Sequence, residues 1–227
     1  MRVLAIVPLA LALLLWSIAT IVIDLRASEF RDVALRFENG ATAPASYFPQ
    51  ALAEIKAGPG FAACSRDTIR SAATISLAGL DTTVATADSP AANEALTNAR
   101  ETLTSALQCI PRDGNLWLRL AMVEFVATDS IPNAARMVRL SAEAAPLEGW
   151  ILKQRLAFTA RLAEIDRSAV ADVLADDIGR FARHARVPDV VAMFGKVDNT
   201  SRDLFLARFS EISAKRRSEI VAGINAR

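Results

Sequence analysis

Few residues of this chain have side chains that could carry out catalysis or bind a metal. His184 is the only histidine, so a histidine-rich metal site is excluded and a Ser-His-Asp triad would have to centre on it. Its arginine-rich surroundings favour a surface position at a helix end. Asp176 and Asp177 are adjacent, and adjacent helical positions point to different faces, so the two carboxylates are not expected to share a proton. We expect them to be solvated at the surface or to be charges at a helix start. Gly58-Pro59-Gly60 is not followed by the Gly-Lys-Ser/Thr of a phosphate loop. The sequence therefore predicts no catalytic, cofactor-binding or metal-binding residues and a protein that is not an enzyme.

The charge of the chain is nearly balanced, at a net +1. This balance argues against a nucleic-acid binder, which needs a basic surface to displace counterions. Residues 180–227 are more basic, with ten Lys/Arg against five Asp/Glu. Their densest cluster is the basic patch Lys215, Arg216 and Arg217, which could meet an acidic partner, an anionic glycan or lipid headgroups. The alternative is an ordinary solvated helix end, where cations suit the helix dipole.

An apolar stretch at the N-terminus predicts a membrane anchor. Residues 3–23 form 21 consecutive uncharged positions, which as a helix would span a hydrocarbon core of roughly 30 Å. The alternative is a cleaved signal peptide, but its apolar core is usually about 7–15 residues long and precedes a small-x-small site that residues 24–28 lack. Arg2 lies before the stretch and the charges just after it nearly cancel. The positive-inside tendency then predicts a single-pass bacterial inner-membrane protein with a cytoplasmic N-terminus and a periplasmic C-terminal domain.

The rest of the chain predicts an all-α fold. We expect a transmembrane helix over 1–24, a juxtamembrane connecting segment over 25–62 with a short helix or two, and a helical domain over 63–227. Apolar residues in that domain recur at three- and four-residue spacing between turn signals, and no segment alternates with a period of two. The predicted helices cover 67–80, 91–110, 116–127, 132–145, 150–162, 168–184, 188–197 and 201–224, the last of which could be two helices.

Two cysteines, Cys64 and Cys109, are the only ones in the chain. The first lies just before one predicted helix and the second at the end of the next, so an antiparallel helix pair would bring them together. In an oxidising compartment this geometry favours a disulfide. The alternative is two buried thiols that act as small apolar side chains.

An internal repeat of 33–35 residues is visible in the helical region. Pro111 and Gly114 recur as Pro146 and Gly149, 35 residues later, whereas Trp117 recurs as Trp150, 33 residues later. One unit, at about 113–147, carries the following residues at matching positions: Trp117, Leu120, Ala121, Ala134 and Pro146. This unit resembles the tetratricopeptide repeat pattern, in a degenerate form, and the resemblance implies a solenoid of helical hairpins.

The resemblance implies a concave surface that binds a partner protein. Counted on the tryptophan spacing, the candidate partner-binding residues are Met122, Phe125, Val126, Arg155 and Thr159. The expected function is that of a membrane-anchored periplasmic scaffold or adaptor in an envelope assembly, such as polysaccharide synthesis or export. The alternative is an accessory or regulatory subunit of a membrane glycan polymerase or ligase that acts through its transmembrane helix. A third possibility is direct binding of an anionic glycan by the basic patch.

Overall fold

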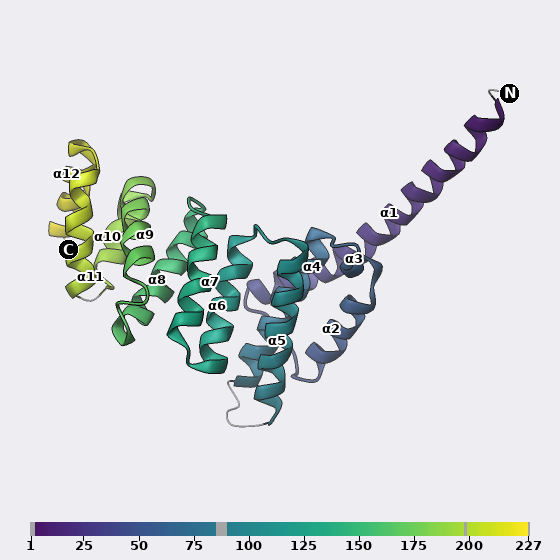
Figure 1. Cartoon of the computed structure of the whole chain (residues 1–227), viewed down its shortest axis with the longest axis horizontal. Coiled ribbons are helices and arrows are strands. Elements are labelled where there is room, and N and C mark those ends of the chain that lie inside the picture. The colour runs from purple at the N-terminus through teal and green to yellow at the C-terminus, as the bar shows by residue number, and fades with distance from the viewer. Residues whose placement is uncertain (1–2, 85–89, 198, 227) are drawn as a thin grey trace. The chain divides into compact units, whose positions relative to one another are not determined.

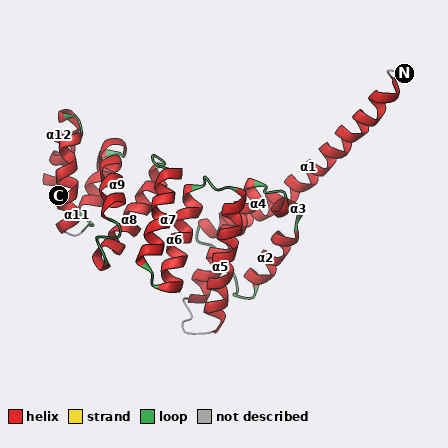
Figure 2. Cartoon of the chain, in the orientation of Figure 1, coloured by secondary structure: helices red, strands yellow, loops and turns green. Residues whose placement is uncertain are grey.

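The computed structural model describes residues 3–84, 90–197 and 199–226, and every regular element in them is a helix (Figures 1 and 2). The chain divides into two compact units, an N-terminal unit, Met1–Pro111, and a C-terminal unit, Arg112–Arg227. The predicted all-α class is confirmed, including an apolar N-terminal helix followed by packed helices.

The N-terminal unit begins with one long helix. Its elements are α1 (Val3–Glu38), α2 (Tyr47–Ala57), α3 (Pro59–Ala62), α4 (Arg66–Val84) and α5 (Pro90–Cys109). The charged residues after position 23 do not end α1, which continues to a turn where Gly40 takes the left-handed conformation with φ 85°. The apolar stretch and the first amphipathic piece of the predicted connecting segment are therefore one helix.

The apolar part of α1 has the properties of a membrane span. Its large side chains from position 11 to 22 are exposed on all sides, and Trp16 is 75% exposed. By length and composition, α1 is the one candidate span in the described residues. Ser17 Oγ and Thr20 Oγ1 donate to the carbonyls of Leu13 and Trp16, at 2.8 and 2.6 Å. Each hydroxyl therefore has a backbone acceptor within the helix.

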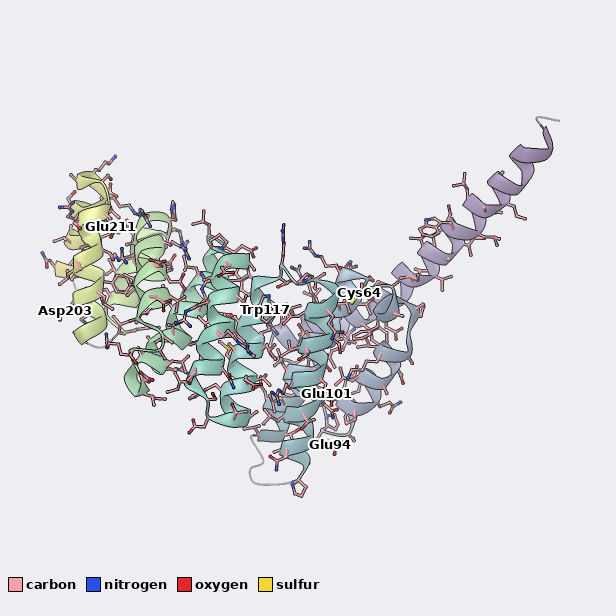
Figure 3. The ribbon with its side chains drawn as sticks, viewed as in Figure 1. Cys64, Glu94, Glu101, Trp117, Asp203 and Glu211 are labelled. Carbon is pink, nitrogen blue, oxygen red and sulfur yellow. A yellow bond between two sulfur atoms is a disulfide. The ribbon has the colours of Figure 1, made fainter. Side chains whose placement is uncertain are left out.

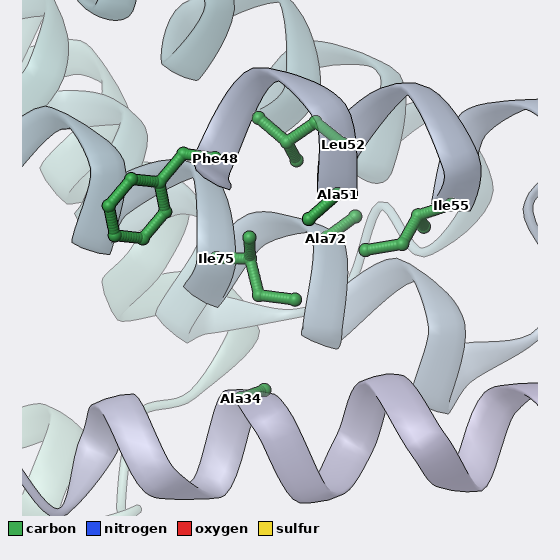
Figure 4. Packing of buried hydrophobic residues seen from close by; sticks show 7 residues of the cluster. All are labelled: Ala34, Phe48, Ala51, Leu52, Ile55, Ala72 and Ile75. Carbon is green, nitrogen blue, oxygen red and sulfur yellow. The ribbon is translucent and has the colours of Figure 1, made fainter. Parts of the chain in front are cut away.

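The C-terminal part of α1 packs into a hydrophobic core with α2 and α4. Figure 4 shows the buried cluster, which consists of Ala34, Phe48, Ala51, Leu52, Ile55, Ala72 and Ile75. The Phe37 ring on α1 lies 5.3 Å from the Phe48 ring on α2, centroid to centroid. A Cβ at Gly79 on α4 would lie 2.9 Å from Phe48 Cβ, so α2 and α4 approach as closely as they do because this residue is glycine.

A disulfide joins the two ends of the α4–α5 hairpin, as predicted. The sulfurs of Cys64 and Cys109 are bonded, with their Cα atoms 5.2 Å apart, and the bond closes a loop of 45 residues. Cys64 precedes α4 and Cys109 ends α5 (Figure 3 labels Cys64). The predicted helix pair places the two thiols within bonding range because it is antiparallel.

The C-terminal unit consists of packed helical hairpins. Its elements are α6 (Gly114–Thr128), α7 (Ile131–Ala144), α8 (Gly149–Ile165), α9 (Ala171–His184), α10 (Val187–Phe194), α11 (Asn199–Arg208), the 3-10 helix η1 (Phe209–Glu211) and α12 (Ala214–Asn225). Helix α6 packs on α7, α8 on α9 and α10 on α12. Pro132 and Pro188 occupy the first turns of α7 and α10, where a proline sacrifices no helical hydrogen bond. The predicted helix over 201–224 is three elements, because the chain turns at 209–213.

Local sequence signals set the start of α6. Asp113 caps it, because Oδ1 accepts hydrogen bonds from the backbone N–H groups of Asn115 and Leu116 at 3.0 and 3.2 Å. A Cβ at Gly114 would lie 2.3 Å from Ala145 Cβ. The α6–α7 hairpin thus closes at a position that only a glycine fits.

Candidate interaction surface

The candidate surface predicted from the repeat falls into an exposed part and a buried part. On α6, Met122 and Phe125 are half-buried, whereas Val126 is 62% exposed. The Phe125 ring meets Phe158 of α8 edge to face, with centroids 6.2 Å apart. Phe125 therefore joins two helices, and Val126 remains open to solvent.

Arg155 and Thr159 do not belong to this surface, and their prediction as groove residues is wrong. Both side chains are fully buried. Thr159 Oγ1 donates to the Arg155 carbonyl oxygen at 2.7 Å, one turn back along α8. A partner could not reach either residue without opening the core.

The repeat spacing explains the error. Helix α6 begins at Gly114 and α8 at Gly149, 35 residues apart, and α5 and α7 end 35 residues apart at Cys109 and Ala144. On this spacing Arg155 corresponds to Leu120, which is 5% exposed, and not to Met122. The two tryptophans, 33 residues apart, do not occupy equivalent positions. Trp117 is the fourth residue of α6, whereas Trp150 is the second residue of α8.

A buried polar network surrounds Arg155. Its Nε and Nη2 donate to Asp177 Oδ2 and Oδ1 of α9 at 2.5 and 2.9 Å. Its Nη1 donates to the carbonyl oxygens of Ser141 and Ala145 at the end of α7, both at 3.2 Å. Ser141 Oγ in turn donates to the Gly114 carbonyl at 2.7 Å. One guanidinium thus connects α7, α8 and α9.

Asp177 was expected to be solvated, and that expectation is also wrong. Asp177 is fully buried, while Asp176 on the neighbouring face forms an exposed ion pair with Arg208 at 3.6 Å. Arg180 adds a second hydrogen bond to Asp177 Oδ1 at 3.3 Å. The two carboxylates do point to different faces, but one of these faces is core.

The basic patch also contains both a half-buried residue and an exposed one. Arg216 is half-buried, and its Nε donates to the Ala182 carbonyl at 2.6 Å while its Nη2 donates to the Ala185 carbonyl. These carbonyls lie at the C-terminal end of α9, where a cation also suits the helix dipole. Arg217 Nη2 donates to the Ile212 carbonyl at 3.3 Å, and Lys215 is exposed. Arg216 therefore fastens α12 to α9.

Exposed apolar side chains that the sequence did not single out as binding residues lie at a turn of the C-terminal unit. Leu147, between α7 and α8, is 58% exposed, and Trp150 is 52% exposed. Tryptophan, with tyrosine and arginine, is one of the residue types enriched in binding hot spots. Its position directly after the Pro146–Gly149 turn is the signal that could have identified it.

An exposed ion pair also connects neighbouring hairpins. Arg139 of α7 donates to both carboxylate oxygens of Asp172 on α9, at 2.8 and 2.9 Å. The hydrogen bond from Arg139 lowers the pKa of Asp172 below its usual value, and the same bond raises the pKa of Arg139.

The remaining candidates for chemistry stay apart. His184 is exposed at the last position of α9. Within the described ranges, no group of three or more His, Cys, Asp or Glu side chains could hold a metal.

Comparison of the chain with family models, curated proteins and solved structures gives no match. Its packed helical hairpins are compatible with a tetratricopeptide-like fold.

Proposed function

We propose that this protein is a membrane-anchored adaptor that holds a helical-hairpin domain at the periplasmic face of a bacterial inner membrane, where it binds a partner protein of an envelope assembly. The observation that carries the proposal is the continuity of α1. The helix that exposes apolar side chains on all sides over 11–22 also contributes Ala34 to the buried core. A folded unit fixed to a span in this way remains at the membrane surface.

Two further observations support the proposal. The Cys64–Cys109 disulfide is compatible with an oxidising compartment. The C-terminal unit exposes Val126, Leu147 and Trp150, which would supply apolar contacts to a partner. Polysaccharide synthesis or export is the assembly that we favour, from the repeat resemblance alone.

Site-specific photocrosslinking in intact cells tests the adaptor function. A photoreactive residue at Trp150 or Val126 should give a discrete adduct with one protein. The matched control is Glu143, an exposed position on α7. Equal adducts at Glu143 and Trp150 would show random collision and contradict the proposal.

A second function is favoured by Trp16, which is 75% exposed near the middle of the apolar stretch. A large aromatic side chain there could contact a neighbouring span, as an accessory subunit of a membrane glycan polymerase or ligase would require. Replacing residues 3–23 with an unrelated span of equal length separates the two functions. If the protein is an adaptor, the replaced chain should still form the Trp150 adduct and support its envelope assembly in cells. If it is an accessory subunit, the replacement should abolish the activity of the membrane enzyme that it serves.

A further inference from the structure

The folded part of the N-terminal unit begins directly at the end of the apolar stretch of α1. Ala27 is only 6% exposed, and together with Ile23 it lies beside residues 57–60, where α2 ends and α3 begins. Figure 1 shows α3 beside the point where α1 emerges from the packed helices. Leu25, on the opposite face of α1, is 65% exposed. At this level α1 is therefore covered by protein on one face and open on the other.

The length of the apolar stretch sets the depth of this junction in a bilayer. Residues 3–23 of α1 would cover about 31 Å at 1.5 Å per residue, which matches a hydrocarbon core of about 30 Å. The polar headgroup layer adds about 5–8 Å on each side. Ala27 lies four residues beyond Ile23, or about 6 Å along the helix. The protein that packs on Ala27 therefore lies at headgroup level when the stretch spans a bilayer.

The segment that packs there is uncharged. Residues 57–65, which we call the α3 segment, contain no Asp, Glu, Lys or Arg. Its exposed side chains include Ala57, Pro59, Ala62 and Ala63, whereas Phe61 packs against the buried cluster of the unit. The side of the segment that faces away from the core thus presents small apolar groups, which lose no ionic hydration on contact with lipid.

The backbone of the α3 segment is also largely paired. Five of its N–H groups donate to carbonyl oxygens three to five residues earlier, at 2.8 to 3.2 Å, and they belong to Gly58, Phe61, Ala63, Cys64 and Ser65. Pro59 has no N–H group to satisfy. The disulfide from Cys64 to Cys109 fastens the segment to the end of α5. Because backbone groups that are already paired lose little when water is removed, the segment can enter the headgroup layer without unfolding.

We propose that the α3 segment is a second membrane contact, which lies in the headgroup layer of the bilayer beside the end of the span. The inference rests on the anchoring by α1 proposed above. A span alone leaves the attached unit one point of contact with the lipid. A second contact on the same rigid unit restricts its tilt relative to the bilayer. Because the exposed side chains of the segment are uncharged, the contact requires no anionic lipid.

Spin labels on the full chain in nanodiscs of phosphatidylcholine test this contact. The two native cysteines are paired, so a cysteine introduced at Ala57 or Pro59 is the thiol that a nitroxide reagent modifies. Collision of the label with oxygen, which concentrates in the bilayer, is compared with collision with a soluble nickel chelate, which stays in water. The oxygen-to-nickel ratio for Ala57→Cys and for Pro59→Cys should exceed that of a control label by about threefold, because headgroup packing excludes the chelate.

The control is Glu94→Cys, an exposed position in the same unit. Glu94 lies on α5, fifteen residues before Cys109, and therefore about 22 Å along the helix from the disulfide. Figure 3 labels Glu94 near one end of α5 and Cys64 near the other. A label at Glu94 should collide freely with the chelate.

A nickel chelate attached to the lipid headgroups separates contact with the bilayer from shielding by protein. Labels at Ala57 and Pro59 should then relax more strongly than the label at Glu94, because the ion lies at their level and its effect falls steeply with distance. A label that is merely shielded by neighbouring side chains would be relaxed weakly by both forms of nickel. That result would overturn the proposal, as would equal oxygen-to-nickel ratios at Pro59 and Glu94.

Two further measurements assign the outcome. A high ratio at Pro59 that appears only in nanodiscs with two copies of the chain would show that a second copy, and not lipid, covers the segment. Ile18→Cys, in the apolar stretch, reports the anchoring separately. A high ratio at Ile18 with equal ratios at Pro59 and Glu94 refutes only the second contact, whereas a low ratio at Ile18 refutes the anchoring as well.

Discussion

Arg155 and Asp177 form a two-pronged ion pair with both side chains fully removed from solvent. The pair joins α8 to α9, and the remaining donors of Arg155 reach the end of α7. A buried charge pair with complete hydrogen bonding contributes little net free energy, but the loss of one member leaves the other charged and unpaired. The pair therefore fixes which helices meet more than it adds stability.

Breaking this pair should be costly. We expect Asp177→Asn or Arg155→Ala to lower the free energy of unfolding by about 3–5 kcal/mol. The double variant Arg155→Leu/Asp177→Leu should lose clearly less than the sum of the two single changes, since it leaves no fully buried charge; Arg180, the other partner of Asp177, is 28% exposed. Urea unfolding of the full chain in detergent measures both. An additive double variant would show that the two residues do not act together.

Removing the disulfide should destabilise the α4–α5 hairpin. For a closed loop of 45 residues, the loop-entropy relation gives about 4 kcal/mol for Cys64→Ala/Cys109→Ala. Thermal unfolding with and without reductant provides the measurement. The wild type should lose stability on reduction, and the double variant should not respond to reductant.

Labelling of thiols in intact cells should report the compartment. If the domain is exported, a bulky maleimide should modify Cys64 and Cys109 only after reduction, and without breaching the inner membrane. Labelling that needs no reductant but requires a breached membrane would reverse the proposed topology and exclude the disulfide in the cell.

The Asp172–Arg139 pair should make stability depend on pH at the acid end. The folded state lowers the pKa of Asp172, so the pair stabilises above the unfolded pKa of about 3.9 and loses this contribution as pH falls through the folded value. The effect should be at most about 1 kcal/mol because the pair is exposed and screened. In Asp172→Asn, the fall in stability between pH 4 and pH 2 should be smaller than in the wild type, by comparison of urea midpoints.

Alanine substitutions at two helical glycines should change the free energy of unfolding in opposite directions. Gly79→Ala places a Cβ 2.9 Å from Phe48, and such overpacking costs about 1–3 kcal/mol. Gly149→Ala meets no atom within 4 Å and should stabilise α8 by up to about 1 kcal/mol. Equal effects would show that the α2–α4 contact is not tight.

The helices and the disulfide could be predicted because their signals are local. Apolar spacing, prolines in first turns and Gly- or Pro-containing breaks mark most helix ends within a few residues. The Cys64–Cys109 bond needs only one further step, that consecutive helices pack antiparallel. Each of these inferences depends on neighbours along the chain.

The errors concern contacts between distant residues. No residue near Arg155 in the sequence indicates that Asp177, on the next helix, faces it. Arg155 was therefore predicted to line a groove and Asp177 to be solvated. The end of the apolar stretch was also taken as the end of a structural element. Charged residues are good helix formers, and α1 continues through them until Gly40.

Because α1 is one continuous helix, it rigidly connects the proposed span to the rest of the N-terminal unit. Each residue of an α-helix turns the chain by about 100° and advances it by about 1.5 Å. Inserting a single alanine after Ser28 would leave the apolar stretch and the Ala34 cluster intact as separate segments, although it would turn Ala27, which is 6% exposed, out of its present contacts. It would nevertheless turn the α4–α5 hairpin by more than a quarter of a revolution about the axis of the span. The number of residues in this helix thus sets the rotation of the folded unit about the axis of the span.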